Sequence, residues 1–215
     1  MAFSSRTVNK FSSGVLRRVG LKPRYQINRG FSIEERWQML RSCALPGDRN
    51  VIDIGCNAGE FTGRFAGQGL FALGLDLVAS SIDFARKRND GTPNLAFGVV
   101  ALSPANVNLL PAFDITLCLS VAHYWHREYG EEACWKMIAS LIARSRAFIF
   151  EGASIRQKYG DTPPQIIDND EASVTTYLAG KLAAAAGGGH ALRYLGKFKS
   201  LGREEFRYMY VVEKR

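Results

Sequence analysis

Three features of this sequence have residue types and spacings that could do chemistry: a glycine turn, a pair of carboxylates and a histidine cluster. The glycine turn is VIDIGCNAGEF at 51–61, in which a β-branched apolar run leads into Gly55 and Gly59. Glycine has no Cβ and tolerates positive φ, so this turn can bring free backbone N–H groups close to a polar ligand at a helix N-terminus. The pattern indicates a nucleotide-binding loop.

The two carboxylates are Asp53, inside the first apolar run, and Asp76, which ends a second apolar run 23 residues later. An acidic side chain at the end of the second strand can accept hydrogen bonds from ribose hydroxyls. The loop departs from the G-x-G-x-x-G pattern of dinucleotide-binding proteins, because Asn57 stands where the second glycine would lie. A pyrophosphate needs that close approach, whereas S-adenosylmethionine (SAM) has no phosphate. Asn57 therefore favours SAM over NAD or FAD.

The histidine cluster, HYWH at 123–126, follows a near-continuous apolar run, and Glu151 ends the next apolar run. Ligands of open α/β sheets bind beyond the carboxyl ends of the strands, so both segments should face an acceptor. His123 or Glu151 is the candidate catalytic base, and Tyr124 and His126 are candidates for positioning the acceptor. The alternative is that His123 packs against the cofactor and that its aromatic neighbours only shape the surface. No metal is expected, because His123, His126 and Glu151 lack a fourth ligand at a characteristic spacing.

The elements that must position these residues alternate along the chain. A capping-box pattern, SIEE at 32–35, predicts a first helix at about 33–44 with Trp37, Leu40 and Leu45 on its apolar stripe. Ser80 or Ser81 is expected to cap the helix that ends near residue 88. Further helices are predicted from about residue 60, at 131–143 and at 171–186. Strands are predicted at 50–54, 71–75, 95–100, 113–119, 147–150, 192–198 and 206–213, and the last two form a hairpin.

Over roughly residues 30–215, the motifs VIDIGCNAG, GLDLVASSIDFAR and FDITLCLSVAHYW resemble those of class I SAM-dependent methyltransferases. The resemblance implies an α/β fold, a Rossmann-like, doubly wound seven-stranded sheet with an antiparallel C-terminal hairpin, and SAM as cofactor. It also implies a first helix that lids the cofactor, with Arg29 and Arg36 as substrate-binding candidates. At 101–104 the chain has ALSP, so the adenine contact would come from Ser103 or from backbone. The cofactor-binding candidates are Asp53, Gly55, Cys56, Asn57, Gly59, Asp76, Leu77, Ala101, Leu102 and Leu119.

Three later segments, LSVAHYWHREYG, AFIFEGASIRQKYG and YLGKFKSLGREEFRYMYVV, resemble the methyltransferase domain of bacterial O-antigen chain-terminating enzymes. They are similar, more weakly, to RNA 5′-phosphate methyltransferases. The resemblance implies O-methylation of a glycan, a lipid-linked saccharide or a phosphate-bearing acceptor. The alternatives are an RNA-directed methyltransferase acting on a 5′-phosphate or ribose, and a non-enzymatic interaction protein with this fold.

Charge is unevenly distributed along the 215 residues, whose net charge is +8. Residues 1–30 hold seven basic side chains and no acidic one, which leaves 21 basic and 20 acidic residues in the remainder. A nearly neutral body argues against a broad basic face for binding a duplex, so nucleic acid is not the favoured partner. The chain is therefore divided into a basic arm at 1–30 and a methyltransferase domain at 31–215.

The arm has apolar residues at helical spacing, with basic residues on another side. A helix of this kind could bind a membrane surface, serve as a mitochondrial targeting segment, or be a solvated or domain-packed extension. No apolar run is long enough to span a membrane, and four widely spaced cysteines suggest reduced thiols. The expected location is the cytoplasm, with peripheral contact at a membrane as an option.

Overall fold

The computed structural model describes residues 30–160, 163–199 and 205–215. Arg29 and the predicted arm, apart from Gly30, lie outside the described residues. Within the described ranges, no helix is both long and apolar enough to cross a lipid bilayer.

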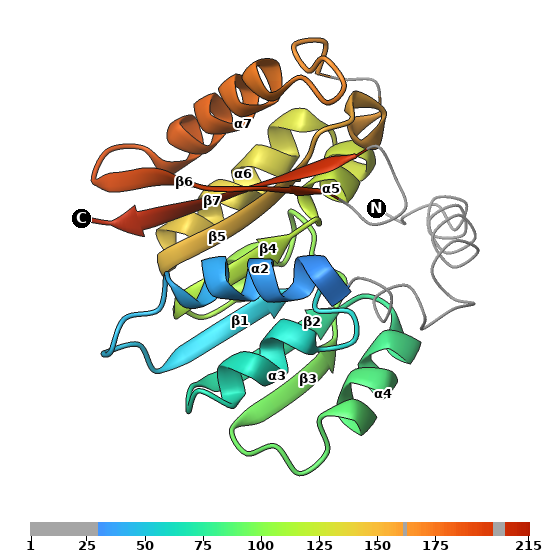
Figure 1. Ribbon diagram of the computed structural model, residues 1–215, viewed down its shortest axis with the longest axis vertical. Coiled ribbons are helices and arrows are strands. Elements are labelled where there is room, and N and C mark those ends of the chain that lie inside the picture. Colours follow the sequence, from blue (N-terminus) through green and yellow to red (C-terminus); the bar gives the residue numbers. More distant parts are fainter. Residues whose placement is uncertain (1–29, 161–162, 200–204) are drawn as a thin grey trace.

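A single seven-stranded sheet forms the centre of the domain, with the strand order β3-β2-β1-β4-β5-β7-β6. Strands β1 to β5 are parallel, and β7 runs antiparallel to both β5 and β6 (Figure 1). This arrangement confirms the predicted sheet and its C-terminal hairpin. The strands are β1 (Asn50–Ile54), β2 (Phe71–Asp76), β3 (Leu95–Val99), β4 (Phe113–Leu119), β5 (Ser145–Ala153), β6 (His190–Lys199) and β7 (Phe206–Lys214).

Helices cover both faces of this sheet (Figure 1). Side chains of α5, α6 and α7 pack on one face, and those of α2 and α3 pack on the other. The helices are α2 (Gly30–Arg41), α3 (Glu60–Ala66), α4 (Ala79–Arg88), α5 (Ala122–Tyr129), α6 (Glu131–Ala143) and α7 (Glu171–Ala186), with short 3-10 turns η2 (Val107–Leu109) and η3 (Arg156–Tyr159).

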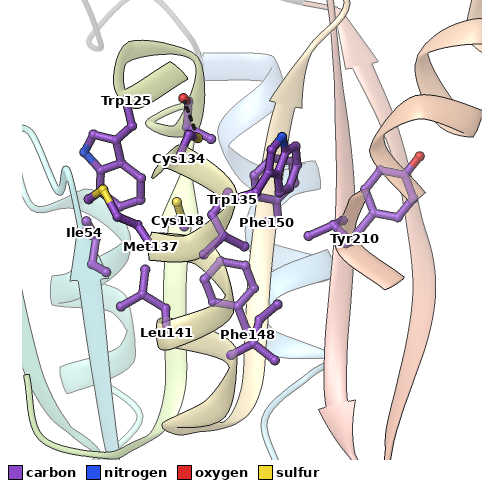
Figure 2. Close-up of a cluster of buried hydrophobic side chains, with 14 of the residues drawn as sticks. Ile54, Cys118, Trp125, Cys134, Trp135, Met137, Leu141, Phe148, Phe150 and Tyr210 are labelled. Atoms are coloured by element: carbon purple, nitrogen blue, oxygen red, sulfur yellow. Dashed lines mark hydrogen bonds between the residues drawn. The ribbon is translucent and has the colours of Figure 1, made fainter. Parts of the chain in front are cut away.

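Helix α6 shows why the sequence pattern predicts this packing. Its apolar residues recur every three or four positions, and all five predicted stripe residues are buried, so they form one inward face. That face packs against aromatic side chains of β5, including Phe148 and Phe150 (Figure 2). The Sγ of Cys134 also donates to the carbonyl of Ala122, which ties α6 to α5 (3.3 Å). The stripe is Cys134, Met137, Ile138, Leu141 and Ile142.

Several local predictions were wrong. Helix α2 begins at Gly30, so Ser32 lies inside the helix rather than at a capping box, and Leu45 is 53% exposed beyond its end. Helix α4 begins at Ala79 after Val78, with no side-chain cap from either serine. Tertiary packing of buried residues such as Trp37 and Leu40 sets these helices more strongly than their capping signals do. Helix α5 was not predicted at all.

Candidate active and cofactor site

Because β1, β2, β4 and β5 are parallel, their carboxyl ends all lie along the same side of the sheet, which we call the cofactor edge. The candidate residues gather there. Ile54 at the end of β1 pairs with Leu75 of β2, next to Asp76. On the other side, Leu119 at the end of β4 pairs with Glu151 of β5. The edge therefore brings the glycine turn, the second carboxylate and the histidine segment together from distant parts of the chain.

The β1–α3 loop is anchored to β2 through its backbone. The amides of Gly55 and Cys56 both donate to the carbonyl of Leu75, at 2.7 and 3.0 Å. Gly55 has φ 73°, and a Cβ at this position would lie 2.5 Å from Cγ2 of Val121. A glycine is therefore required at position 55 both by the backbone conformation and by the turn that follows β4.

Asn57 also has a left-handed backbone, with φ 48°. Asparagine tolerates this conformation better than most residues, so it performs here the conformational role that a glycine would perform. Its backbone amide donates to Oδ2 of Asp76 (3.0 Å), which joins the loop to the second carboxylate. Gly59 is left-handed as well, with φ 69°, and a Cβ there would meet the ring of Phe97 at 2.6 Å.

The Asp76 carboxylate accepts hydrogen bonds from two backbone segments, the β1–α3 loop and the turn after β2. Its Oδ2 accepts from Asn57, and its Oδ1 accepts from the amide of Val78 (2.8 Å). Burial, as the largest effect, raises the pKa of Asp76 above its usual value, against the lowering effect of these backbone donors. Each carboxylate oxygen has two lone pairs, so Asp76 retains capacity to accept from ribose hydroxyls.

Asp53 lies beneath the loop and is 3% exposed. Its Oδ2 accepts from the hydroxyl of Thr62 in α3 (2.7 Å). Burial raises the pKa of Asp53 to about 6, although the Thr62 hydrogen bond and the Arg36 charge both oppose that rise. Asp53 therefore supports the loop from within, by linking β1 to the first turns of α3.

The turn after β3, where the adenine contact is expected, is held by Asn106, a residue that sequence reasoning missed. The Asn106 side chain accepts from the amide of Ser103 (2.8 Å) and donates to the carbonyl of Ala101 (3.0 Å). It thereby holds the turn after β3, in which Ala101 is exposed and Leu102 is buried. Leu77 and Val99 are 41% and 50% exposed, and they offer apolar surface close to Asp76.

On the acceptor side, β4 passes through Ser120 into α5. Ser120 has φ 60°, a conformation that costs a non-glycine residue about 1 to 3 kcal/mol. The other left-handed non-glycine residues described are all asparagines, which tolerate it more readily. The Ser120 hydroxyl donates to Oε1 of Glu151, and its amide donates to the Glu151 carbonyl at 3.1 Å. A strained turn is thus tied to the end of β5.

His123, in the first turn of α5, is 3% exposed. Its ring contacts those of Tyr124 and Tyr159, with centroids 4.3 and 6.2 Å away, and its Nδ1 has no hydrogen-bond partner in the described part of the chain. Burial lowers the pKa of His123 well below its usual value, and the charges of Arg207, Lys158 and Arg127 lower it further. The imidazole is therefore neutral at pH 7, which is the form that can accept a proton.

The other two candidates on α5 differ in exposure. Tyr124 is 41% exposed, and the guanidinium of Arg127 lies over its ring, 5.4 Å from the centroid. His126 is 3% exposed and packs edge-on against Tyr159, with centroids 5.4 Å apart. Tyr124 is thus exposed on the surface of α5, whereas His126, like His123, is buried in this structure.

Glu151 is the centre of a buried charge network. Its Oε2 accepts from Arg36 of α2 (2.5 Å), while its Oε1 accepts from Ser120 and lies 3.9 Å from Nε of Arg207. Arg207 pairs in turn with Glu205, whose other oxygen lies 3.6 Å from the Lys158 ammonium. Both oxygens of Glu151 are engaged, so this geometry favours a positioning role for Glu151 over a role as the base.

Arg36 is likewise internal, at 5% exposed. Its guanidinium lies between the rings of Phe61 and Phe198, 4.8 and 5.2 Å from their centroids, in addition to its contact with Glu151. Among the described residues, Arg36 therefore pairs with Glu151, and its assignment to the substrate stays a prediction. The ion pair between Arg36 and Glu151 holds α2 close to the carboxyl ends of the strands, where the cofactor candidates gather.

Sequence reasoning could not find most of this network. Arg36 and Glu151 are 115 residues apart, and Ser120 and Glu151 are 31 apart, so no local motif joins them. Arg207 and Glu205 flank the start of β7 without a recognisable pattern. The one available signal was Glu151 itself, an acid at the end of an apolar strand. In the residues that the structure describes, no group of three or more His, Cys, Asp or Glu side chains could hold a metal ion.

Comparison with known proteins agrees with this geometry. Residues 52–145 match the family model described as "Methyltransferase domain", and they run from the glycine loop through the acceptor-side helix. Over these residues the chain is similar to a methyltransferase domain, and the strand order of the sheet agrees with that similarity. The glycine loop, the Asp76 carboxylate and the exposed apolar surface of Leu77 and Val99 fit the polar and aromatic parts of SAM.

Relatives of known structure share this fold. The O-antigen chain terminator bifunctional methyltransferase/kinase WbdD of Escherichia coli is 29% identical over 122 residues, which are 55% of this chain and 17% of that protein. The chain thus spans less than a fifth of this curated relative. A WbdD crystal structure gives a TM-score of 0.66 at 23% identity, covering 92% of this chain and 42% of that one. The structure of magnesium protoporphyrin IX methyltransferase from Synechocystis PCC 6803, with bound SAM, gives a TM-score of 0.63 at 16% identity, and the match covers 100% of this chain and 99% of that one.

Replacing Asp76 with alanine should weaken SAM binding about 10- to 150-fold. Hydrogen bonds to a charged group contribute about 1.5 to 3 kcal/mol each, and the change also releases the amides of Asn57 and Val78. Isothermal titration calorimetry with SAM measures the change. Asp83→Ala is the matched control, because Asp83 is an exposed carboxylate on α4 and should leave the affinity unaltered. Unchanged affinity in Asp76→Ala would remove Asp76 from the cofactor site.

Replacing Asp53 with asparagine should change how stability depends on pH. The pKa of Asp53 is raised in the folded state to about 6 from 3.8, so its stabilising contribution is full below about pH 4 and is lost as the pH rises through 6. The asparagine variant, which has no charge to bury, should therefore gain about 3 kcal/mol relative to the parent between pH 4 and pH 7. Urea denaturation of both proteins at several pH values measures this gain, and a pH-independent difference would contradict it.

Proposed function

We propose that the protein transfers the methyl group of SAM to an oxygen atom of a saccharide, a glycolipid or a phosphate-bearing acceptor. SAM supplies a sulfonium methyl group, which an acceptor oxygen takes in a displacement that releases S-adenosylhomocysteine. The main tasks of the protein are then to hold the acceptor in line and to exclude water. A hydroxyl acceptor also needs a base, whereas an ionised phosphate does not.

One observation carries this proposal: a neutral, buried imidazole lies just beyond the end of β4, close to the basic residues Arg127, Lys158 and Arg207. Arg127, Lys158 and Arg207 all lower the pKa of His123, after the larger effect of burial. The exposed guanidinium of Arg127 can attract an anionic acceptor, and the neutral His123 can take the proton of a hydroxyl group. In this role Tyr124 and Arg127 contact the acceptor, and Glu151 holds the turn that carries His123.

The name of the Escherichia coli relative, a chain terminator of O-antigen, supports a surface saccharide as the acceptor class. The nearly neutral charge of residues 31–215 supports a glycan over RNA. Contact of the basic arm with a membrane surface and a cytoplasmic location fit a lipid-linked acceptor, and both belong to this proposal.

Incubation of the protein with methyl-labelled SAM and a fractionated bacterial extract tests the acceptor class. Label should enter the lipid-linked saccharide or polysaccharide fraction. Alkaline phosphatase treatment of the extract before the reaction should abolish methylation of a terminal phosphate and leave methylation of a hydroxyl unaltered. An Asp76→Ala protein controls for labelling that does not depend on the cofactor site. Label in the RNA fraction would replace this acceptor class with an RNA substrate, and label in small molecules alone would exclude both.

A further inference from the structure

The turn between β4 and α5 touches both halves of the site. Val121 packs against Gly55 so closely that a Cβ at position 55 would lie 2.5 Å from its Cγ2, so this turn and the cofactor loop lie against each other. Two residues later, His123 lies in the first turn of α5. The direction in which the chain leaves β4 therefore fixes the place of the imidazole relative to the cofactor loop.

That direction is set at Ser120. Its left-handed backbone lies in the turn that leads from β4 into α5, and its hydroxyl and amide both donate to Glu151. Glu151 is in turn held by Arg36, which reaches it from α2, and lies close to Arg207 of β7. Glu151, which α2 and β7 reach through Arg36 and Arg207, thus holds a residue that would not adopt this conformation unaided.

We propose that Ser120 is a positioning residue, which uses its hydroxyl contact with Glu151 to hold α5 and thereby keeps His123 in its place against Tyr159, two residues beyond the contact of Val121 with the cofactor loop. This inference rests on the proposed function, because it assigns Ser120 a task in the same acceptor site. Ser120 itself takes no part in proton or methyl transfer. Because Glu151 contacts both Ser120 and Arg36, a shift of α2 would also shift the turn that carries His123.

Two variants separate the hydroxyl contact from the backbone conformation. Ser120→Ala removes the hydroxyl and retains a Cβ at positive φ, whereas Ser120→Gly removes the hydroxyl and adopts the left-handed turn without cost. Asn94→Ala is the matched control, because Asn94 is also left-handed (φ 58°) but lies in the exposed loop before β3. It should lower stability through the same backbone effect and leave the site unaltered.

The readout is the imidazole of His123, observed by NMR. The chain has three histidines, so single His→Gln variants assign every ring signal. Both Ser120 variants should shift the His123 ring signals and alter its titration, since the ring moves relative to Arg207, Lys158 and Arg127. With a transferable acceptor, kcat should fall about 10- to 100-fold while the dissociation constant for SAM stays within about twofold.

Superimposable His123 signals in the parent, Ser120→Ala and Ser120→Gly proteins would overturn the proposal and leave Ser120 a structural residue. Shifted signals in Ser120→Ala alone would also overturn it, because the backbone conformation and not the hydroxyl would then place α5. This measurement needs no acceptor. A parent protein that fails to methylate any fraction defeats the proposed function, whereas unmoved imidazole signals defeat the role of Ser120.

Discussion

Replacing His123 with glutamine is expected to lower kcat for methylation of a hydroxyl acceptor by about 10²- to 10⁴-fold. That range is the usual contribution of a general base, and glutamine retains a polar side chain of similar reach without a titratable nitrogen. The affinity for SAM should change little, because Asp76 and the β1–α3 loop are placed by contacts that do not include His123. Steady-state kinetics with labelled SAM, combined with calorimetry, separates the two quantities.

The pH dependence of kcat/KM in the parent enzyme shows which protonation state of His123 is active. Only the neutral imidazole can accept a proton, and the pKa of His123 is lowered well below its usual value, so kcat/KM should rise with pH below 6.5 and stay level above it. The acidic limb should be missing in His123→Gln. His190→Gln, which alters a histidine on β6, is the control and should retain the parent profile. A small loss of kcat with an unaltered profile would show that the acceptor is already ionised, as a phosphate is.

The second large effect concerns stability. Replacing Glu151 with alanine should lower the free energy of unfolding by about 3 to 5 kcal/mol, because it removes the buried carboxylate that Arg36 and Arg207 share. For a chain of this length, this loss corresponds to a fall in Tm of about 6 to 20 °C. Ser120 also loses the acceptor of its hydroxyl, so the turn after β4 should loosen.

Thermal and urea denaturation measure this loss. Glu151→Gln keeps the shape and an acceptor oxygen but removes the charge, so it should fall between the parent and Glu151→Ala. Glu132→Ala removes an exposed carboxylate, paired only with Lys136 on the surface of α6, and should change stability by less than about 0.5 kcal/mol. Equal stability of Glu151→Ala and Glu132→Ala would show that the network contributes nothing to the fold.

The sequence predicts the strands and the glycine loop of the cofactor half well, because its signals are local. The β1–α3 loop, Asp76 and the strands beneath them lie within 30 residues of one another, and glycine positions report backbone geometry directly. Asn57 is an instructive case. As a departure from the dinucleotide pattern it favours SAM, but its left-handed φ shows that the backbone there still has a conformation typical of glycine.

The acceptor half is predicted less well, because its geometry depends on long-range contacts. Helix α5 is only eight residues long, which gives periodicity few positions to act on, and its direction follows from the strained backbone of Ser120. The partners of Glu151 come from α2, the β4–α5 turn and β7, which periodicity and spacing cannot bring together. Arg36 illustrates the consequence: the family resemblance suggested a substrate contact, and only the fold reveals its contact with the buried carboxylate of Glu151.

The most direct test of the central claim is a calorimetric titration of the parent protein with SAM, with S-adenosylhomocysteine and NAD⁺ as comparison ligands. The account predicts saturable, one-site binding of SAM and of S-adenosylhomocysteine at micromolar concentrations, no binding of NAD⁺, and a 10- to 150-fold loss for Asp76→Ala. Absence of SAM binding at high micromolar concentrations, in a protein that circular dichroism shows to be folded, would contradict the assignment and favour a non-enzymatic role for this fold.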